Sequence, residues 1–549
     1  MTDNVKLDMN YRFNDQELEE LKPYGAVRRH EAGAILFDEG DRETDLLVLL
    51  NGALNVYLHE HGEERRVGWL EPGQFTGDVS MITGQRSLVK ARMEEAGEVL
   101  HISRDSLKRL LVERSGLSDA LVTAFIARRA WARASGRASV VLVGRAFDQQ
   151  AFSIRDLLTK HAVPHLWVEA DADPQAAAIV ERLRLTLDDT PILVSGADET
   201  LVKPSLSEVS RALGLDLLPD KACADVIVVG AGPAGLAASV YAASEGLSVV
   251  TLDATAPGGQ AGTSSKIENY LGFPSGISGR ELAERANVQA QKFGARLAAP
   301  AKAVKLEEND GAYCLHLEDG RSLSARAIVV AAGADYRRLP IDNIAQYEGR
   351  GIYYGATAME AQICKGSTIA IVGAGNSAGQ GAVFLAGYAK DVHVLYRRPN
   401  IRDTMSEYLV RRLEETDNIH LHPETEITAV NGDGARIQSA ELTTGGAKNT
   451  TLDNPFLFLF IGATPAAGWL PETIARDDKG FLKTGAAIEN IQLVKAGWSL
   501  DRMPEIYETS WPRVYAVGDV RSGSVKRVAS GVGEGSVVVQ YIHRALAEV

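Results

Sequence analysis

The stretch DVIVVGAGPAGLAASVYAASEGLSVVTLDA, residues 225–254, decides the fold of the second half of the chain. An apolar run typical of a buried strand leads into Gly230-x-Gly232-x-x-Gly235, and a helical pattern and a second apolar run follow. In the dinucleotide-binding fingerprint the first glycine allows a tight turn, the second lets the backbone approach a pyrophosphate, and the third lets the helix pack closely on the strand. We therefore predict a Rossmann-like domain that begins near Ala224.

The rest of this stretch supplies the other parts of a dinucleotide site. Pro233 and Ala234 open the helix, whose free backbone N–H groups face a phosphate. Asp253 ends the next apolar run, eighteen residues after Gly235, where a carboxylate would bond a ribose hydroxyl. The strand, the helix and the acid are all in place, so the pattern predicts a nucleotide site rather than a chance turn.

A second strand–glycine–helix unit, STIAIVGAGNSAGQGAVFLAGYAKDVHVLYRR, occupies residues 367–398. Its predicted nucleotide-binding residues are Gly373, Gly375, Asn376, Ser377 and Ala378, which replaces the third glycine. No acid follows the next strand, and its place is taken by Arg397, Arg398 and Arg402. Guanidinium groups bind a 2′-phosphate in bidentate fashion, whereas a carboxylate would repel it. The unit therefore predicts NADPH rather than NADH.

These two units and several further motifs, all in the same order, resemble the low-molecular-weight thioredoxin reductases across residues 224–549. The further motifs are PGGQ (257–260), IENYLGFP (267–274), IVVAAGA (328–334), FIGATPAAG (460–468) and VYAVGDV (514–520). The resemblance implies an FAD-binding domain formed by residues 224–343 and 461–549. It also implies an NADPH-binding domain, residues 344–460, inserted between those two segments.

The resemblance implies FAD and NADPH as cofactors and a homodimer, and it extends the set of cofactor-binding residues. The additional residues expected at FAD are Gly259, Gln260, Asn269, Val304, Gly333, Gly518, Asp519, Arg527, Val528 and Ala529. It further implies a rotation of the NADPH domain that brings the nicotinamide to the flavin. No side chain stands out as an acid or a base, so no catalytic residue is predicted.

One segment departs from the family and decides the expected chemistry. Thioredoxin reductases carry Cys-Ala-Thr-Cys just before the second nucleotide unit, but this chain has Gly355-Ala356-Thr357-Ala358. Electron transfer to thioredoxin by that route requires thiolates. Cys364 stands alone beyond the segment and cannot form the pair by itself. We therefore expect the reduced flavin to pass electrons elsewhere, and the small Gly355 and Ala358 could leave room for an acceptor.

The chain has only three cysteines, Cys223, Cys314 and Cys364, and no Cys-x-x-Cys occurs. Their wide spacing supports neither a disulfide framework nor a zinc site, and no metal site is predicted. We expect each of the three to be an inert core residue, as free cysteines usually are.

Residues 12–135 combine short β-rich runs with flanking helical patterns, which favours a β-roll. Within them GQFTGDVSMITGQRSLVKARM, residues 73–93, resembles the phosphate-binding cassette of cyclic-nucleotide-binding domains. That resemblance yields four candidate regulatory residues, Gly77, Asp78, Arg86 and Ser87. Asp78 replaces the usual glutamate, and its spacing to Arg86 is shorter than usual. A cyclic nucleotide is one candidate ligand, and a degenerate roll that docks or dimerises is the alternative.

Residues 138–216 alternate strand and helix patterns in the order βαβαββα. This order, with Thr190-Pro191 just before a strand, resembles a thioredoxin/glutaredoxin-type domain with its cis-proline. The redox Cys-x-x-Cys of that family is absent, so the domain would be a spacer or a recognition surface. A receiver-like domain is the alternative, although the segment lacks the paired acids and the terminal lysine of that family.

Charge and hydropathy argue against several classes of function. The net charge is −14 and no long basic run occurs, so neither nucleic acid nor an anionic membrane is an expected partner. The chain has no continuous apolar stretch long enough to span a membrane and no apolar signal core near its start, so a cytoplasmic protein is expected. A βαβ pattern, not a helix-turn-helix, follows the β-roll, which argues against a transcription factor.

These features predict a multidomain α/β protein with an N-terminal β-roll, a thioredoxin-like domain and two Rossmann-like domains. The expected function is that of an NADPH-dependent flavoprotein oxidoreductase whose flavin passes electrons to an unidentified acceptor, either a small molecule or a redox protein. Two alternatives stay open. One is a sensor that relays redox state to a partner. The other is a thioredoxin reductase that uses a substitute thiol.

Overall fold

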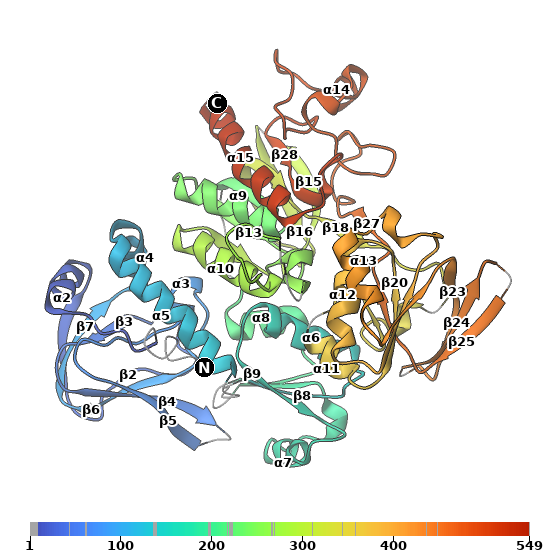
Figure 1. Ribbon diagram of the computed structural model, residues 1–549. Helices are drawn as coiled ribbons and strands as arrows, with labels where there is room; N and C mark the ends of the chain where they lie inside the picture. The colour runs from blue at the N-terminus through green and yellow to red at the C-terminus, as the bar shows by residue number, and fades with distance from the viewer. Residues whose placement is uncertain are drawn as a thin grey trace.

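The protein is described by a computed structural model in which four domains, each with its own core, follow one another along the chain (Figure 1). The described residues are 9–547 except 43, 61–62, 135–139, 196–198, 217, 219–222, 265–266, 268, 310, 343, 357, 435 and 447. None of the helices among them is both long and apolar enough to cross a membrane.

The N-terminal domain pairs two antiparallel sheets, with strand orders β1-β7-β3 and β2-β6-β4-β5. Its strands are β1 (Ala26–His30), β2 (Ile35–Phe37), β3 (Leu46–Leu49), β4 (Ala53–Glu60), β5 (Glu63–Leu70), β6 (Lys90–Glu95) and β7 (Gly97–Ile102). Its helices are α2 (Asp15–Leu21), α3 (Ser80–Thr83), α4 (Arg104–Glu113) and α5 (Ser115–Ala134). The strands alternate with turns, as the sequence predicts, and this domain is the predicted β-roll.

The middle domain has the predicted order of strands and helices. It comprises β8 (Val140–Gly144), α6 (Gln149–Lys160), β9 (His165–Glu169), α7 (Pro174–Arg182), β10 (Ile192–Ser195), β11 (Glu199–Val202) and α8 (Leu206–Leu213). The strand order is β11-β10-β8-β9; β8 and β9 are parallel, and the other pairs are antiparallel. The Thr190–Pro191 peptide bond is cis.

The first Rossmann-like domain is built on a sheet in the order β14-β13-β12-β17-β16-β15, with β28 beside β17. Its strands are β12 (Cys223–Val229), β13 (Val249–Leu252), β14 (Arg296–Ala298), β15 (Ala303–Asn309), β16 (Ala312–Leu317), β17 (Ser322–Val330) and β28 (Val514–Ala516). Helix α9 (Pro233–Ser244) packs between α10 (Gly279–Lys292) and α15 (Val528–Ala547) on one face (Figure 1). A further helix, α14 (Asn490–Ala496), lies near the C-terminal end.

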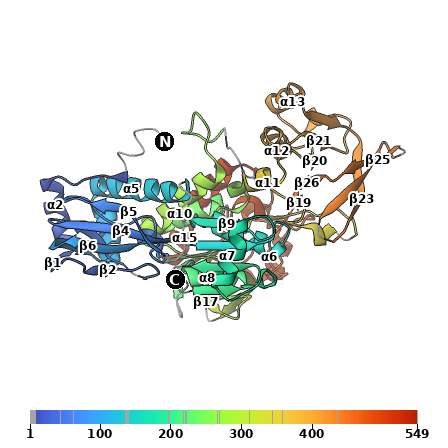
Figure 2. The ribbon, with the colours of Figure 1, turned by 90° about the horizontal axis from the view of Figure 1, so that it is seen from below.

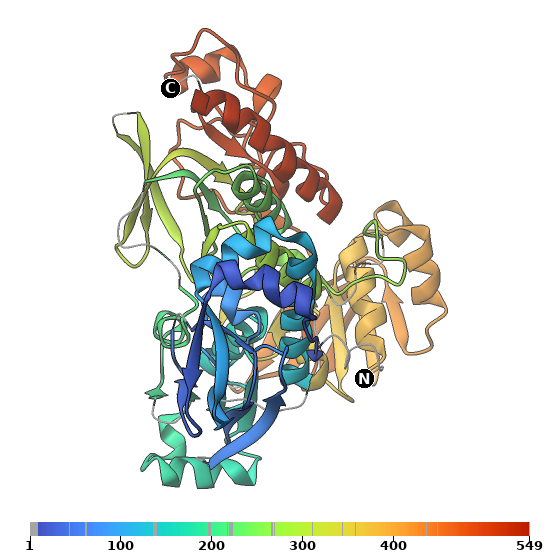
Figure 3. The same ribbon diagram turned by 90° about the vertical axis from the view of Figure 1, so that its left-hand side faces the viewer.

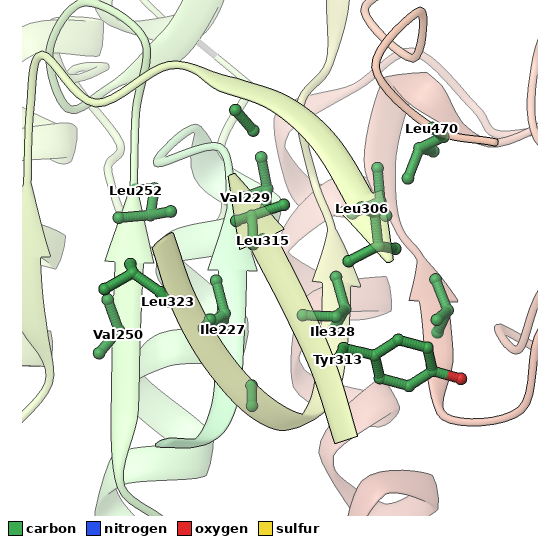
Figure 4. Close-up of a cluster of buried hydrophobic side chains, with 14 of the residues drawn as sticks. Ile227, Val229, Val250, Leu252, Leu306, Tyr313, Leu315, Leu323, Ile328 and Leu470 are labelled. Atoms are coloured by element: carbon green, nitrogen blue, oxygen red, sulfur yellow. The ribbon is translucent and has the colours of Figure 1, made fainter. Parts of the chain in front are cut away.

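Strands β15 and β16, at one edge of this sheet, curl over the other face of its parallel strands. Figure 4 shows Leu306, Tyr313 and Leu315 over the side chains of the parallel strands. Alternate residues of β12, such as Ile227 and Val229, enter this core, while Val226 and Val228 point to the helices. A strand buried on both faces needs apolar residues at every position, which explains the unbroken run in the sequence.

The inserted Rossmann-like domain has a parallel sheet in the order β19-β26-β20-β21-β22. Its parts are β19 (Ile352–Tyr353), α11 (Ala358–Ile363), β20 (Thr368–Val372), α12 (Asn376–Ala386), β21 (Asp391–Leu395), α13 (Glu407–Glu414), β22 (Ile419–His422) and β26 (Phe456–Leu459). An antiparallel meander of β23 (Thr425–Gly432), β24 (Ile437–Thr444) and β25 (Lys448–Asp453) covers one face. The short pair β18 (Ala334–Tyr336) and β27 (Ala463–Pro465) joins the two Rossmann-like domains.

The N-terminal domain and the inserted domain lie at opposite ends of the molecule in Figure 2. Seen from the N-terminal side, the N-terminal domain lies in front and α15 at the top (Figure 3). The N-terminal domain docks on α10, whose Val288 is buried in the N-terminal core. Arg133 of α5 also forms a bidentate ion pair with Glu284 of α10.

The middle domain touches all three of its neighbours. Phe152 of α6 packs against Tyr353 of the inserted domain, with ring centroids 5.8 Å apart. The Ser210 hydroxyl donates to the carbonyl of Ala299 in the first Rossmann-like domain at 3.1 Å. Glu199 accepts a hydrogen bond from Arg86 of the N-terminal domain at 3.2 Å. The middle domain therefore contacts each of the other three domains.

Gly235→Ala should destabilise the protein, whereas Gly533→Ala should not. A Cβ on Gly235 would lie 1.8 Å from the carbonyl oxygen of Gly230, so α9 would have to move off β12. Overpacking of this kind costs about 3 kcal/mol. Gly533, on α15, has nothing within 4 Å of an added Cβ, so alanine should be neutral or stabilise the helix by up to about 1 kcal/mol. Thermal unfolding midpoints would compare the two variants, and equal midpoints would contradict the packing argument.

Candidate functional site

A cavity of about 1110 Å³ lies at the carboxyl ends of β12 and β13 in the first Rossmann-like domain. Ligands bind at this edge of open α/β sheets. Most of the residues that the sequence predicts at FAD line it, namely Gly230, Gly232, Pro233, Ala234, Asp253, Gly259, Gln260, Val304, Gly333, Gly518, Asp519, Arg527 and Val528. The predicted residues come from segments that lie far apart in the sequence, and the fold places them around one cavity.

The glycines of the first fingerprint have the geometry that their predicted roles require. Gly230 has φ +108°, and a Cβ there would lie 2.2 Å from the carbonyl oxygen of Ala331 on the neighbouring strand. Gly235 does not line the cavity and instead lets α9 approach the carbonyl of Gly230. Gly232 lines the cavity, where a side chain would separate the backbone from a ligand.

The Asp253 carboxylate is held by backbone N–H groups at the end of β13. It accepts hydrogen bonds from Ala231 at 2.9 Å and from Thr255 and Ala256 at 3.0 Å. These bonds tie the fingerprint loop to the next strand end and fix the direction of the carboxylate. Each oxygen of an ionised carboxylate can accept further bonds, so a ribose hydroxyl could still be bound.

Glu534 is a functional residue that the sequence reasoning missed. Its buried carboxylate accepts from the backbone N–H of Gly518 at 2.7 Å and pairs with Arg521 at 2.5 Å. It therefore holds the loop that carries Asp519 at the cavity. A lone carboxylate within the small and apolar residues of α15 was the available signal, because a buried charge needs a partner.

Asp519 and Lys526 are two ionisable groups at the cavity that affect each other. Burial raises the pKa of the Asp519 carboxyl, and the nearby Lys526 opposes that rise. Burial also lowers the pKa of Lys526, while Asp519 counteracts the change. Both groups also line the cavity, where a hydrogen-bonding ligand would meet them.

Besides Gly235, two residues expected at FAD do not line the cavity. Asn269 lies in an exposed loop, next to Leu271, whose side chain is 94% exposed. Ala529 lies on α15, one residue past Val528, which does line it. Their assignment rested on spacing alone, and spacing does not determine how a loop or a helix turns its residues. Gln260, by contrast, lines the cavity and donates to the carbonyl of Ala334.

The second fingerprint faces the same cavity from the inserted domain. Ser377 at the start of α12 lines it, together with Gln380, Gly381 and Phe460. Gly373 has φ +148°, and a Cβ there would lie 2.5 Å from the carbonyl oxygen of Phe460. Four further predicted residues, Gly373, Gly375, Asn376 and Ala378, lie outside the lining.

Three of the residues outside the lining, Gly375, Asn376 and Ala378, determine how the start of α12 packs. The Asn376 side chain accepts from the backbone N–H of Ser406 at 2.7 Å, which ties the helix start to the segment before α13. Ala378 is fully buried in the core of the inserted domain, so its small side chain lets α12 pack closely. Gly375 has open space around it and leaves the backbone accessible.

The three predicted phosphate-binding arginines follow β21 and are exposed. Arg397 lies 3.6 Å from Glu426, and Arg402 lies between Glu407 at 3.4 Å and Glu414 at 2.9 Å. Arg398 has no ion pair within the described part of the chain. Exposed ion pairs contribute little, so these carboxylates could be displaced by a phosphate.

The segment that replaces the family's dithiol also reaches the cavity. Gly355 and Ala356 line it, and Ala358 begins α11 and is exposed. Thr357 lies outside the described residues. None of the described residues of this segment is a cysteine.

The expectation that all three cysteines are core residues is wrong for Cys223. Cys364 is fully buried, but Cys223 is exposed and Cys314 is half-buried. Cys223 is the first residue of β12, where the strand enters the sheet from the surface. Cys223 and Cys314 both pair with Ser324 of β17, so a whole strand separates them. Strands lie about 4.8 Å apart, which places the two sulfurs beyond disulfide reach.

The described residues fit FAD. The cavity lies between a glycine loop, a helix N-terminus and the Asp519 loop, and its volume exceeds that of most small-molecule sites. Gly230 and Gly518 have positive φ, with values of +108° and +73°, which brings their backbones to the cavity edge. A dinucleotide needs such backbone contacts for its pyrophosphate.

In the N-terminal domain, the candidate regulatory residues are engaged by protein groups. The buried Asp78 carboxylate accepts from Arg129 Nε of α5 at 2.7 Å and from the Ser80 hydroxyl at 2.6 Å. Arg86 pairs with Glu199 of the middle domain at 3.2 Å. Gly77 has φ +98°, and the Ser87 hydroxyl donates to the carbonyl of Val89 at 2.7 Å. The structure thus connects the cassette to α5 and to the middle domain.

Comparison with known proteins agrees with this architecture. A thioredoxin reductase of Bacillus subtilis (strain 168) is 28% identical over 326 residues, which cover 59% of this chain and 95% of that protein. NADPH-dependent thioredoxin reductase 3 of Arabidopsis thaliana is 31% identical over 331 residues, covering 59% of this chain and 58% of that protein. The solved thioredoxin reductase of Lactococcus lactis shares the fold, with a TM-score of 0.52 and 24% identity over 59% of this chain and all of that one.

Two family models match the chain. The cyclic nucleotide-binding domain model matches residues 27–114, which covers the β-roll and α4. The pyridine nucleotide-disulphide oxidoreductase model matches residues 224–535, more than half of the chain. FAD and NADPH, the cofactors expected from the sequence, are those of the thioredoxin reductases in that family. The chain therefore belongs to the pyridine nucleotide-disulphide oxidoreductase family and carries a cyclic nucleotide-binding domain at its N-terminal end.

Proposed function

We propose that this chain is an NADPH-dependent FAD oxidoreductase of the thioredoxin reductase type that passes electrons to an acceptor other than a dithiol of its own. The observation that carries the proposal is the segment Gly355-Ala356-Thr357-Ala358, in which Gly355 and Ala358 stand where the family has cysteines and Gly355 lines the FAD cavity. We further propose a homodimer in the cytoplasm. Bound FAD supplies a carrier that accepts two electrons from NADPH and releases them to the acceptor.

The residues of the chain bind and orient the two cofactors. The backbone of Gly230 and Gly232 and the N-terminus of α9 would hold the FAD pyrophosphate, and Asp253 would accept a hydrogen bond from a ribose hydroxyl. The start of α12, with Ser377 at the shared cavity, would bind NADPH. Because Gly355 and Ala356 have little or no side chain, they leave space beside the flavin for an acceptor.

The remaining cysteines support a centre without a thiol partner. Burial raises the pKa of the Cys364 thiol to about 12, so the thiolate that exchange requires is not formed near pH 7. Cys364 Sγ lies 3.7 Å from the carbonyl oxygen of Ala361, inside the core of the inserted domain. This argues against the alternative of a thioredoxin reductase with a substitute thiol.

Anaerobic titration of the FAD-loaded protein with NADPH should bleach the flavin with about one equivalent, because only the flavin stores two electrons. The double variant Gly355→Cys/Ala358→Cys should need about two equivalents, since it restores the family's dithiol frame. Flavin absorbance measures both.

Cys364→Ser is the matched control for this titration and should leave the stoichiometry at about one. If the unaltered protein takes two equivalents and Cys364→Ser takes one, a substitute thiol is present and the proposal is wrong. If the flavin does not bleach, or bleaches and is reoxidised slowly by every acceptor tried, the sensor alternative is favoured instead.

The preference for NADPH should depend on Arg398. A charge-assisted hydrogen bond to the 2′-phosphate contributes about 1.5–3 kcal/mol, so Arg398→Met should lower kcat/KM for NADPH by roughly 10- to 150-fold and leave NADH unchanged. Lys390→Met, just before the opposite end of β21, is the control and should change neither value. Stopped-flow flavin reduction with both nucleotides gives the rates, and an equal loss for NADPH and NADH would contradict the assignment.

We also propose that the N-terminal domain responds to a cyclic nucleotide only after Arg86 leaves Glu199. This proposal rests on the match of residues 27–114 and on the Arg86–Glu199 ion pair. A cyclic phosphate and the Glu199 carboxylate would compete for the same guanidinium. The alternative, a roll that only docks, is favoured by the burial of Asp78 against Arg129.

Glu199→Gln should therefore tighten the binding of cyclic AMP or cyclic GMP. This half-buried ion pair contributes about 1 kcal/mol, so the expected gain is about fivefold. Arg86→Gln should abolish binding, and isothermal titration of the three proteins with each nucleotide tests both expectations. Absence of binding to both the unaltered protein and Glu199→Gln would leave the domain with a docking role alone.

A further inference from the structure

A second cavity, of about 690 Å³, lies where the four domains meet. It is lined by residues from α3, α5, the turn after α6, the segment 257–264, α10, the first residue of α11 and the C-terminal part of α12. Figure 1 shows α5, α10, α6, α11 and α12 coming together around the centre of the view. Its volume falls within the range of about 300–1000 Å³ that small-molecule sites occupy. We call it the junction cavity.

The junction cavity borders the cyclic-nucleotide cassette at Val79, Thr83 and Gln85, but none of the four candidate regulatory residues of the cassette lines it. None of its lining residues among those described belongs to a strand of the β-roll, and Asp78 and Arg86 do not line it. It does adjoin the FAD cavity, because Lys160 and Ser264 line both. The two cavities are therefore neighbours, and a molecule in one would lie close to the other.

Arg129 brings unsatisfied donors to the junction cavity. Its side chain is 3% exposed; Nε donates to Asp78 at 2.7 Å, and Nη1 donates to Gln85 at 2.9 Å and to the carbonyl of Ala162 at 3.3 Å. Nη2 is buried and has no hydrogen-bond partner within the described residues. A buried charged group with unpaired N–H donors is unfavourable, so an acceptor at this place would be stabilised.

His161 adds a second unsatisfied nitrogen to the same lining. Its side chain is 7% exposed, and Nε2 is buried without a partner among the residues described. The ring also hydrogen-bonds to the backbone of Thr255. Burial, with the neighbouring Lys160, lowers the pKa of His161 to about 4, so the neutral ring can give or accept one hydrogen bond at pH 7.

Arg280 supplies a further cation, on the first turn of α10. Two other arginines of the lining are neutralised, since Arg133 pairs with Glu284 and Arg285 pairs with Glu281. Arg280 has no ion pair in the part of the chain that the structure describes. The start of a helix disfavours a cation unless an anion lies nearby, so the position of Arg280 also favours an anionic ligand in this cavity.

We propose that the junction cavity binds a small polyanion carrying phosphate or carboxylate groups, whose oxygens accept hydrogen bonds from Arg129 Nη2 and Arg280. Ala358 and Phe384 of the inserted domain also line the cavity. The bound anion therefore joins all four domains and stabilises their present arrangement. Because the inserted domain carries the NADPH site, occupancy of the cavity controls how freely that domain moves relative to FAD. This consequence rests on the proposed function, whereas binding itself does not.

The test uses the full chain loaded with FAD, with saturating NADP⁺ to fill the second dinucleotide site. Pyrophosphate and citrate are the two probes, and isothermal titration gives their affinity and stoichiometry. We expect one of them to bind at one molecule per chain, and the better probe distinguishes a phosphate from a carboxylate ligand. Binding should also raise the thermal unfolding midpoint, since a ligand that binds only the assembled state stabilises it.

Two substitutions test the residues that carry the proposal. Arg129→Lys keeps a cation beside Asp78 but removes the Nη2 donors, and Arg280→Gln removes a charge without breaking an ion pair of the described structure. Each should weaken probe binding at least tenfold. Lys292→Gln, at the far end of α10 and outside the lining, should bind the probe as the unaltered protein does. If Arg129→Lys does not fold, Arg280→Gln decides the test.

Three results would overturn the proposal. The first is no binding of either probe at millimolar concentration, which would mean that water alone fills the cavity. The second is binding that Arg280→Gln leaves unchanged. The third is binding that Arg86→Gln abolishes, which would place the anion at the cassette. The one-equivalent flavin titration is independent of all three, so failure here is distinguishable from failure of the proposed function.

Discussion

The close approach of helix α9 to strand β12 is the constraint on which the catalytic half of the protein depends. Gly235 lets the helix reach the carbonyl of Gly230, and Gly230 in turn lies against Ala331 of the neighbouring strand. These contacts put the N-terminus of α9 at the end of the sheet, where Asp253 and the Gly518–Asp519 loop also arrive. Any larger residue would push apart the elements that form the FAD cavity.

The segment that stands in place of the family's dithiol lies beside this frame. In a thioredoxin reductase the segment before the second nucleotide unit stores electrons, and here it leaves small residues at the cavity wall. A family likeness therefore assigns the fold and the cofactors, while the acceptor depends on particular side chains. Cys364 is buried, and strand β17 lies between Cys223 and Cys314.

The added N-terminal half is connected to the redox half through protein contacts that a ligand could alter. Arg86 pairs with Glu199 of the middle domain, and Val288 of α10 is buried in the N-terminal core. The middle domain contacts every other domain, and it has no cysteine among its residues 138–216. Such contacts allow a ligand bound to the N-terminal domain to shift the conformational equilibrium of the redox half, provided that the ligand's affinity differs between the two conformations.

The sequence alone determined the local features, because they depend on short-range geometry. The strand–glycine–helix units, the acid at Asp253, the arginines after β21 and the absent dithiol could all be read from spacing. Only the tertiary structure decided the features that depend on contacts between residues far apart in the sequence. It placed Asn269 away from the cavity, gave Gly518 its partner Glu534, and put Arg86 beside Glu199. It also brought Arg129, His161 and Arg280 around one cavity, since contacts between distant residues follow from packing and not from spacing.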